Sequence, residues 1–361
     1  MRQSRGRPGP EDFATREFFR DLIDNHTRLF AGRQAESTRI TDYIRTEGSG
    51  YVFVEAGSGY GKTSLLADLV SRHPDFRYHF ISQAYSGRGE GLFDPVKPVH
   101  VLDCLCEQLD PAHVRGSDEE TVQRRFRALL SHEPKKPTVI VLDAIDELKE
   151  PERLCHVFPQ QLPRDLVVLL SGRTYGDQRS CLNAIGLSPK NAGLHLQLQG
   201  LDEAVLVELL QLAGGAATGL AEDADFVAGV HQVSAGDPFY LRFLVEDAAA
   251  GVLTREIIHR TPSGLEGYLD EQFNQLARAR RTEQHGEILA LLLEGPLSAR
   301  DLMEQVPGLT WDFDTVMQQI HRFLLFRRRS VPDGAPSRSG EIYSICHDRF
   351  RQYFLSRIGL G

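Results

Sequence analysis

The sequence has few cysteines, and they are too scattered to form a metal site or a disulfide framework. The five are odd in number and lack the paired spacing of zinc ligands, so we expect reduced thiols, several of them buried. They are Cys104, Cys106, Cys155, Cys181 and Cys346. Motifs of the types Gly-x-Ser-x-Gly, His-Glu-x-x-His and Cys-x-x-Cys do not occur. Hydrolases with a nucleophile elbow, zinc peptidases and zinc fingers therefore have no support.

Long apolar runs and an excess of positive charge are also missing. No stretch approaches the roughly eighteen apolar residues of a transmembrane helix, and no apolar segment follows the basic start MRQSRGRPGPEDF as it would in a signal peptide. We therefore expect a cytoplasmic protein with no membrane partner. Lys and Arg number 41 against 50 Asp and Glu, a net charge of −9. This charge gives the whole chain no attraction to nucleic acid.

Apolar residues are nonetheless plentiful enough for sizeable cores. They make up 41% of the 361 residues, with 25% charged, as in ordinary globular proteins. At roughly 150 residues per domain, the length favours two to three domains. No internal repeat is visible, which excludes a solenoid or propeller. Residues 1–16 are expected to be a flexible leader, with a helix starting near Glu17.

Residues 17–200 are predicted to form an α/β domain. Short apolar runs bounded by turn signals alternate with helical patterns, which predicts a mostly parallel sheet with helices on both faces. The predicted strands are YVFVEA, FRYHFIS, PTVIVLDA, DLVVLLSG and LHLQLQG, and the predicted helices are 62–72, 99–109, 118–131 and 151–160. The insertion SGRGEGLFDPVKP has too many Gly and Pro for either element and is expected to be an exposed loop.

The remaining residues carry helical periodicity and then a different pattern. Residues 201–262 are predicted to be a helical domain with breaks at Gly214-Gly215 and Gly236-Asp237-Pro238. Residues 263–361 show three helical patterns (EILALLLEG, SARDLMEQV, DFDTVMQQIHRFLLF), then a polar turn flanked by two strand-like runs, then a last helix. This order predicts a winged-helix domain.

The most specific motif is AGSGYGKTSLL, which lies between a predicted strand and a predicted helix. Only a Gly-rich backbone can turn several amides toward a phosphate tail, and the following helix N-terminus favours the anion. Lys62 is placed to reach the β- and γ-phosphates, and the Thr63 hydroxyl to ligate Mg²⁺. The motif departs from the P-loop pattern at Ala56, where that pattern has its first glycine. An alanine is tolerable there if its φ stays negative. The predicted nucleotide-binding residues here are Gly57, Ser58, Gly59, Tyr60, Gly61, Lys62, Thr63 and Ser64.

Acidic residues follow the predicted strand in TVIVLDAIDEL. Asp143 is predicted to hold the hydration shell of Mg²⁺, together with Thr63 as metal ligand. Asp146 or Glu147 is predicted to orient the attacking water, because phosphoryl transfer needs positioning more than covalent chemistry. Taken alone, these acids are equally well explained as a helix N-cap; beside a phosphate loop they are not.

Arg173 ends the next predicted strand, in DLVVLLSGRTYG. It lies at the same carboxyl edge of the sheet, where ligands bind, so its cation is a candidate sensor of the γ-phosphate. The alternative is a solvated arginine in a loop. The predicted catalytic residues are Lys62, Asp146, Glu147 and Arg173.

The ordered set of motifs resembles the signal-transduction ATPases with numerous domains, the STAND class, and within it the bacterial NACHT-like proteins. The motifs are LFAGRQAE, AGSGYGKT, VIVLDAIDE, LLSGR, SAGDPFYLRFL and ICHDRFRQYFL, covering about residues 28–357. The resemblance implies that Phe30, Gly32 and Arg33 lie against adenine. It also implies that Pro238 packs on the base and that His347 bonds the β-phosphate of ADP. Without the resemblance, His347 is better explained as a half-buried histidine opening the last helix.

The resemblance implies an ATP/ADP switch with Mg²⁺ as cofactor and a signalling or defence role. ADP would hold a closed state, ATP exchange would favour an open, self-associating form, and slow hydrolysis would reset it. Such proteins usually carry an effector and a repeat sensor, which do not occur here, so the chain is expected to be either a fragment or a minimal switch. No side chain is a recognisable guanine reader, so the residues alone do not choose between ATP and GTP.

Two alternatives stay open at the level of sequence. One is a DNA-handling ATPase of the initiator type, which also joins a P-loop core to a winged helix; the other is a nucleotide-locked scaffold that does not hydrolyse. The basic cluster Arg327, Arg328 and Arg329 precedes the predicted wing. Because aromatic interleaving is lacking and the chain is acidic, we expect a solvated or interdomain role for it and regard nucleic acid as an unlikely partner.

Overall fold

The structure, a computed structural model, describes residues 12–86, 93–110, 112–114, 118–173, 180–278, 282–328, 338 and 340–358. Contacts divide the chain into two compact units. The first comprises Met1–Gly57, Gly61–Ile81 and Pro95–Gln199, and the second Ser58–Tyr60, Ser82–Asp94 and Gly200–Gly361. The predicted helical and winged-helix regions both fall in the second unit. Most of the predicted leader, and residues 87–92 of the insertion at 86–98, lie outside the described residues.

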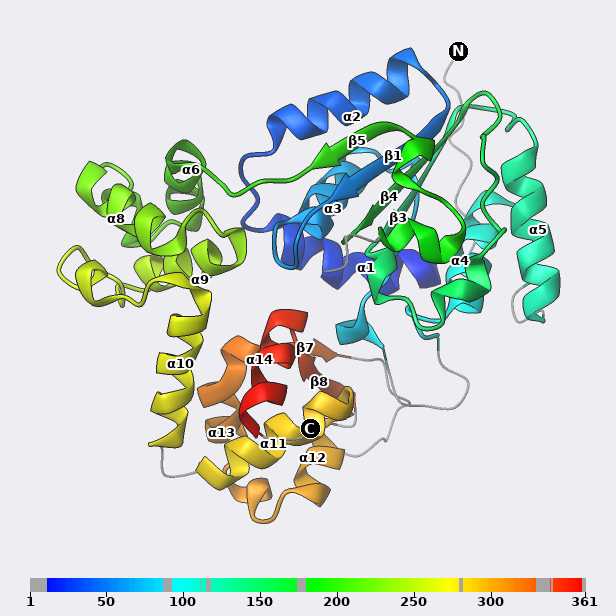
Figure 1. The fold of residues 1–361 in the computed structure, drawn as a ribbon. Helices are drawn as coiled ribbons and strands as arrows, with labels where there is room; N and C mark the ends of the chain where they lie inside the picture. Colours follow the sequence, from blue (N-terminus) through cyan, green and yellow to red (C-terminus); the bar gives the residue numbers. More distant parts are fainter. Residues whose placement is uncertain are drawn as a thin grey trace, which may run out of the picture. The chain divides into compact units, whose positions relative to one another are not determined.

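A five-stranded parallel sheet forms the centre of the first unit (Figure 1). All five predicted strands are confirmed, in the order β2-β3-β4-β1-β5. They are β1 (Gly50–Glu55), β2 (Arg77–Phe80), β3 (Thr138–Asp143), β4 (Leu166–Gly172) and β5 (Ala192–Gln197). Because the strands are parallel, β1, β3 and β4 end at the same edge, where the motif residues follow.

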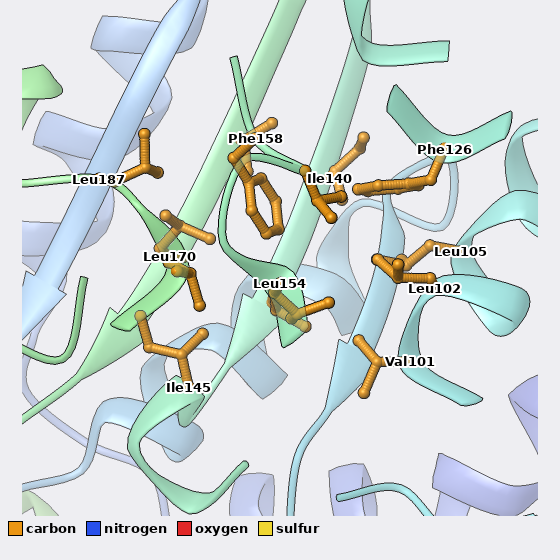
Figure 2. Close-up of a cluster of buried hydrophobic side chains, with 14 of the residues drawn as sticks. Val101, Leu102, Leu105, Phe126, Ile140, Ile145, Leu154, Phe158, Leu170 and Leu187 are labelled. Carbon is orange, nitrogen blue, oxygen red and sulfur yellow. The ribbon is translucent and has the colours of Figure 1, made fainter. Parts of the chain in front are cut away.

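Alternation along the strands separates the two faces of this sheet. Figure 2 shows one apolar core, to which β3 contributes Ile140, β4 Leu170, α4 Leu102 and α5 Phe126. The side chains that alternate with these core residues along β3 and β4 point to the opposite face of the sheet, where α3 contacts both strands. The three inner strands β1, β3 and β4 are buried on both sides, β4 along its whole length, whereas the edge strand β5 is partly exposed. This explains their nearly continuous apolar sequences and confirms the predicted layers.

The helices of the first unit are α1 (Asp12–Thr27), α2 (Gln34–Thr46), α3 (Lys62–Arg72), α4 (Pro98–Leu109) and α5 (Glu119–Ser131). Three of them, α3, α4 and α5, begin and end within a residue of the predicted positions; α1 begins at Asp12, earlier than the predicted start near Glu17, and α2 was not predicted. The predicted helix at 151–160 is wrong. Only a 3₁₀ turn, η3 (Pro151–Leu154), forms there, and His156 follows in the left-handed conformation with φ +68°, which a helix cannot continue through. Other 3₁₀ turns are η1 (Gln83–Tyr85), η2 (Ile145–Glu147), η4 (Cys181–Ile185) and η5 (Pro189–Asn191).

The second unit starts with helices separated at the predicted breaks. They are α6 (Glu203–Ala213), α7 (Ala217–Leu220), α8 (Ala224–Ser234), α9 (Pro238–Ala249) and α10 (Gly264–Ala277), with the 3₁₀ turn η6 (Ile258–Arg260) before α10. Asp202, Asp223 and Asp237 cap α6, α8 and α9 by accepting hydrogen bonds from first-turn amides. Asp237 thereby fixes the point at which the chain turns into α9.

The C-terminal part is a winged helix, as predicted. Its elements are α11 (Thr282–Glu294), β6 (Leu297–Ser298), α12 (Ala299–Gln305), η7 (Leu309–Trp311), α13 (Phe313–Ile320), η8 (His321–Phe323), β7 (Leu324–Arg328), β8 (Glu341–Ile345) and α14 (Asp348–Ile358). The strands form an antiparallel sheet of order β6-β8-β7.

The third helix of this region is shorter than predicted. The apolar run Leu324-Leu325-Phe326 belongs to strand β7, where Leu324 pairs with Ile345 and Phe326 with Tyr343. A short apolar run fits either period, so only pairing with β8 decides it. Among the described residues, no helix combines the length and apolar character needed to cross a bilayer.

Candidate nucleotide-binding site

The phosphate loop joins β1 to α3 through two turns that require glycine. Gly59 and Gly61 have φ of +81° and +86°, in the left-handed region. Gly61 immediately precedes α3 and has no side chain with which to cap it. The amides of the first turn therefore point toward the loop, where they and the helix dipole favour an anion. Ala56 is not among the residues with positive φ, so its methyl group is tolerated as predicted.

The Lys62 ammonium is folded over this loop. It is 8% exposed, and its Nζ donates hydrogen bonds to the carbonyl oxygens of Ala56 (2.9 Å) and Gly57 (3.0 Å). Burial lowers the pKa of Lys62, whereas the carboxylates of Asp146 and Asp143 act in the opposite direction. The cation thus lies where the phosphate tail of a nucleotide would be held by the loop amides.

Thr63 and Asp143 meet beside the loop, although they are 80 residues apart. The Thr63 hydroxyl donates to Oδ2 of Asp143 at 2.7 Å, and the Ser171 hydroxyl donates to Oδ1 at 2.5 Å. Burial raises the pKa of Asp143, and these two hydrogen bonds oppose the rise. Ser171 was not among the predicted site residues. The signal for it was a hydroxyl near the end of an otherwise apolar strand.

The two remaining acids have different surroundings. Asp146 pairs through Oδ2 with Arg173 Nε, and its side chain is 4% exposed. Its Oδ1 is buried without a hydrogen-bond partner. Arg173 is thus engaged by the site rather than solvated. Glu147 follows Asp146 in η2 and is half-buried.

The predicted adenine segment lies before α2. Gly32 and Arg33 both have positive φ, +69° and +68°. The Arg33 guanidinium pairs with Glu36 at 3.1 Å and donates to the carbonyl of Gln199 at 2.5 Å, and its side chain is 6% exposed. The side chain therefore connects this segment to the end of the first unit. Contact of Phe30, Gly32 and Arg33 with a base stays a prediction.

Ser64, the last predicted loop residue, has its hydroxyl engaged by α1. Its Oγ lies 3.1 Å from Nδ1 of His26. The side chain of Ser64 therefore helps to hold α1 against α3, and its backbone amide is the group that suits a phosphate.

Pro238 and His347 belong to the second unit and come close to each other there. Pro238 is the first residue of α9, and the next residue, Phe239, stacks on the His347 ring with centroids 4.0 Å apart. His347 precedes α14, and its Nδ1 accepts from the Arg349 amide at 3.1 Å. Arg349 in turn pairs with Asp237 at 2.6 Å. The roles of Pro238 and His347 toward a nucleotide stay predictions.

The donor set at Thr63 and Asp143 fits magnesium. Mg²⁺ prefers hard oxygen ligands, retains several waters, and is usually bound by one or two protein oxygens plus substrate phosphates. A hydroxyl and a carboxylate, with both carboxylate oxygens already fixed, match that pattern. Among the described residues, no group of three or more His, Cys, Asp or Glu could hold a metal without a substrate.

Within the second unit, Arg327 contacts an aromatic side chain. Its Nη1 donates to the Tyr85 carbonyl at 3.2 Å, and its guanidinium lies 4.7 Å from the centre of the Tyr85 ring. Of the two predicted roles for the basic cluster, solvated or interdomain, the solvated one is wrong for Arg327, which packs on Tyr85. The Arg328 side chain and Arg329 lie outside the described residues.

Lys62, Thr63 and Asp143, placed at one edge of a parallel sheet, have the arrangement of a P-loop NTPase. No protein-family model and no curated protein matches the chain. Among solved structures, it is similar to a signal-transduction ATPase with numerous domains (STAND) with a tetratricopeptide repeat sensor from Pyrococcus horikoshii. The TM-score is 0.47 at 14% identity, covering 90% of this chain and 42% of that one.

It is also similar to ORC1 of Aeropyrum pernix in complex with DNA. There the TM-score is 0.42 at 16% identity, covering 94% of this chain and 96% of that one. For Cdc6p of Pyrobaculum aerophilum, the TM-score is 0.41 at 12% identity, covering 91% and 94%. These likenesses do not distinguish the bacterial NACHT-like proteins from other P-loop ATPases, and they give no support to the prediction that nucleic acid is not a partner.

Proposed function

We propose that this chain binds an adenine nucleotide with Mg²⁺ at the loop between β1 and α3 and uses it as a conformational switch. The observation that supports this best is the Thr63–Asp143 hydrogen bond of 2.7 Å beside a loop over which Lys62 is folded. These are the groups that a P-loop needs for a metal-bound phosphate tail. The choice of adenine rests on the resemblance to STAND ATPases.

Each residue of the site has a distinct part in this proposal. Bound Mg²⁺ supplies charge neutralisation on the phosphates. Lys62 binds the β- and γ-phosphates, and the amides of Gly57–Thr63 surround the diphosphate. Asp146, which is paired with Arg173, or Glu147, which follows it in η2, orients the attacking water, and we take Glu147 as the first candidate. Arg173 contacts the γ-phosphate and exchanges part of its pairing with Asp146 for it.

Nucleotide exchange would drive the switch through the second unit. In the proposal, Pro238 contacts the base and His347 the β-phosphate of ADP in a closed state. ATP favours an open form that self-associates, and slow hydrolysis resets the closed form. To move the population from mostly closed to mostly open, the binding free energy of the nucleotide must differ between the two forms by about 5 kcal/mol. Signalling or defence output would then depend on effector and sensor modules, as in STAND proteins.

The first experiment identifies the nucleotide that co-purifies with the protein. The protein is denatured and the supernatant is separated by chromatography, with ADP as the expected product. Calorimetry on nucleotide-stripped protein then measures uptake of ADP and ATP with magnesium. Lys62→Ala should abolish binding, whereas Lys135→Ala, at an exposed position before β3 and thus at the opposite edge of the sheet, should not. An empty or guanine-filled pocket, or no uptake by the wild type, contradicts the proposal.

A DNA-handling ATPase is the second candidate, favoured by the three-stranded winged helix joined to a P-loop unit. It predicts duplex binding with a steep salt dependence, whose slope decreases when Arg327, Arg328 and Arg329 are neutralised. Loss of all binding at moderate salt, without sequence preference, counts against it. A measurement of phosphate release distinguishes the third candidate, the nucleotide-locked scaffold, from the switch and the DNA-handling ATPase. The scaffold should release no phosphate.

A further inference from the structure

Ser171 is the one polar residue in strand β4 before its final glycine, and it is completely buried (0% exposed). Leu142 pairs with Leu170, so Asp143 and Ser171 lie next to each other one position further along β3 and β4. Leu142 and Leu170 both belong to the apolar core, in which Figure 2 labels Leu170. Asp143 and Ser171 therefore point to the other face, toward α3 and Thr63.

The Ser171 hydroxyl makes two hydrogen bonds of different kinds. It donates to Oδ1 of Asp143 at 2.5 Å and accepts from the backbone amide of Ala144 at 2.8 Å. Ala144 is a non-glycine residue with φ +56°, a conformation that an alanine adopts only when its surroundings hold it. One side chain thus fixes both a carboxylate and the turn that follows it.

The two bonds act on different parts of the site. Oδ2 of Asp143 accepts from Thr63, so with Ser171 on Oδ1 the carboxylate has both oxygens occupied and a fixed orientation. The Ala144 turn leads directly into η2, which carries Asp146 and Glu147. The same hydroxyl therefore fixes the position of Asp143, the predicted metal ligand, relative to Asp146 and Glu147, the acids that would orient water.

We propose that Ser171 is the positioning residue of the magnesium site. It acts through Asp143 and Thr63 and does not touch the metal or the nucleotide itself; the inference rests on the proposed function. The two hydrogen bonds account for a serine at this buried position, because an apolar side chain would leave Oδ1 of Asp143 and the Ala144 amide without this partner. Groups that orient metal ligands in this way usually change metal affinity by 10–100-fold when removed.

The test separates magnesium binding from nucleotide binding. ADP affinity is measured by calorimetry in EDTA, and magnesium is then titrated into the ADP-saturated protein while its thermal midpoint is followed. For Ser171→Ala we expect the ADP affinity in EDTA to stay within about twofold of wild type. The magnesium concentration that gives half of the thermal shift, the magnesium midpoint, should be about tenfold higher. Ser171→Thr keeps the hydroxyl and should recover most of the magnesium response.

A second buried serine provides the matched control. Ser344 of β8 is 0% exposed and donates to the Ala84 carbonyl at 2.7 Å, so Ser344→Ala removes a comparable bond outside the nucleotide site. The inference is wrong if Ser171→Ala leaves the magnesium midpoint unchanged, or if Ser344→Ala shifts it equally. Wild-type protein that binds no ADP refutes the proposed function first, and the two failures are therefore distinguishable.

Hydrogen exchange gives a readout that does not need a nucleotide. In wild type, the Ala144 amide is bonded to Ser171, so its exchange should be slow. Ser171→Ala should accelerate exchange in the peptide containing Ala144 while the amides of β3 stay protected. Acceleration throughout β3 and β4 would instead indicate general destabilisation and contradict a positioning role. Ser171→Cys fills more of the volume and serves for the same measurements if the alanine variant does not fold.

Discussion

Arg322 and Asp247 form an ion pair inside the second unit, between the turn before β7 and helix α9. Nη1 of Arg322 donates to Oδ2 of Asp247 at 3.2 Å, and Nη2 pairs with Oδ1. The Tyr268 hydroxyl of α10 donates to the same carboxylate at 3.3 Å and accepts from the guanidinium. Asp247 is only 7% exposed and Tyr268 only 5%. This network joins the helical region to the winged helix within one unit.

Removing the cation should strongly destabilise the protein. Arg322→Ala leaves the Asp247 carboxylate buried without its partner, and we expect the free energy of unfolding to fall by about 3 kcal/mol. Urea denaturation followed by circular dichroism measures the change. Arg300→Ala is the control, since Arg300 and Glu304 are both more than half exposed and such pairs contribute less than about 1 kcal/mol.

The double variant Arg322→Met with Asp247→Leu separates the charge effect from lost packing. Apolar residues of similar size remove both buried charges, so the loss should be smaller than for Arg322→Ala alone. If the free energy of unfolding falls equally in the two variants, the unpaired charge of Asp247 is not the cause of the destabilisation.

The sequence predicts the strands and the phosphate loop well because both depend on local patterns. Lys62 and Thr63 are fixed by a contiguous motif, and Asp143 by its place at a strand end. Ser171 was missed because its role depends on strand register, which a single sequence does not show. The Arg322–Asp247 pair joins residues 75 positions apart, and no spacing rule relates them. The run at 324–326 was predicted to be helical because a short apolar run fits either period, and only its pairing with β8 places it in a strand.

His79 should make stability depend on pH. It is fully buried in β2, with Nε2 2.9 Å from the Pro95 carbonyl oxygen. Burial lowers its pKa from 6.5 to about 4, an effect that His100 reinforces and the Pro95 hydrogen bond opposes. As the pH falls from 6.5 to about 4, the unfolded chain takes up a proton that the folded chain does not. The free energy of unfolding should therefore fall by up to about 1.4 kcal/mol per pH unit.

His79→Gln tests this dependence, because glutamine keeps a donor for Pro95 but does not titrate. Urea denaturation at about pH 7 and pH 5 gives the difference for each protein, and the loss on acidification should be smaller in the variant by about 2 kcal/mol. The same loss in both proteins would show that other groups dominate acid sensitivity in this range.

Gly172 is expected to tolerate no side chain. A Cβ there would lie 2.2 Å from Sγ of Cys181 and 3.3 Å from Oδ1 of Asp146. Gly172→Ala should therefore lower the free energy of unfolding by about 1–3 kcal/mol. Gly172→Ala with Cys181→Ala removes the closest collision and should recover part of the loss. Gly286→Ala, inside α11 with nothing within 4 Å, should instead be neutral or stabilising by up to about 1 kcal/mol.

Glu147→Gln should slow hydrolysis without weakening binding, because the amide cannot accept a proton from the attacking water. We expect phosphate release from Mg·ATP to fall about a hundredfold under single-turnover conditions, with ADP affinity unchanged by calorimetry. Asp146→Asn should have a smaller effect, since Asp146 acts through its pairing with Arg173. Glu152→Gln, at an exposed position in η3, is the matched control and should release phosphate at the wild-type rate. If Asp146→Asn abolishes release while Glu147→Gln does not, Asp146 orients the water; if neither changes the rate, the water is positioned by other groups.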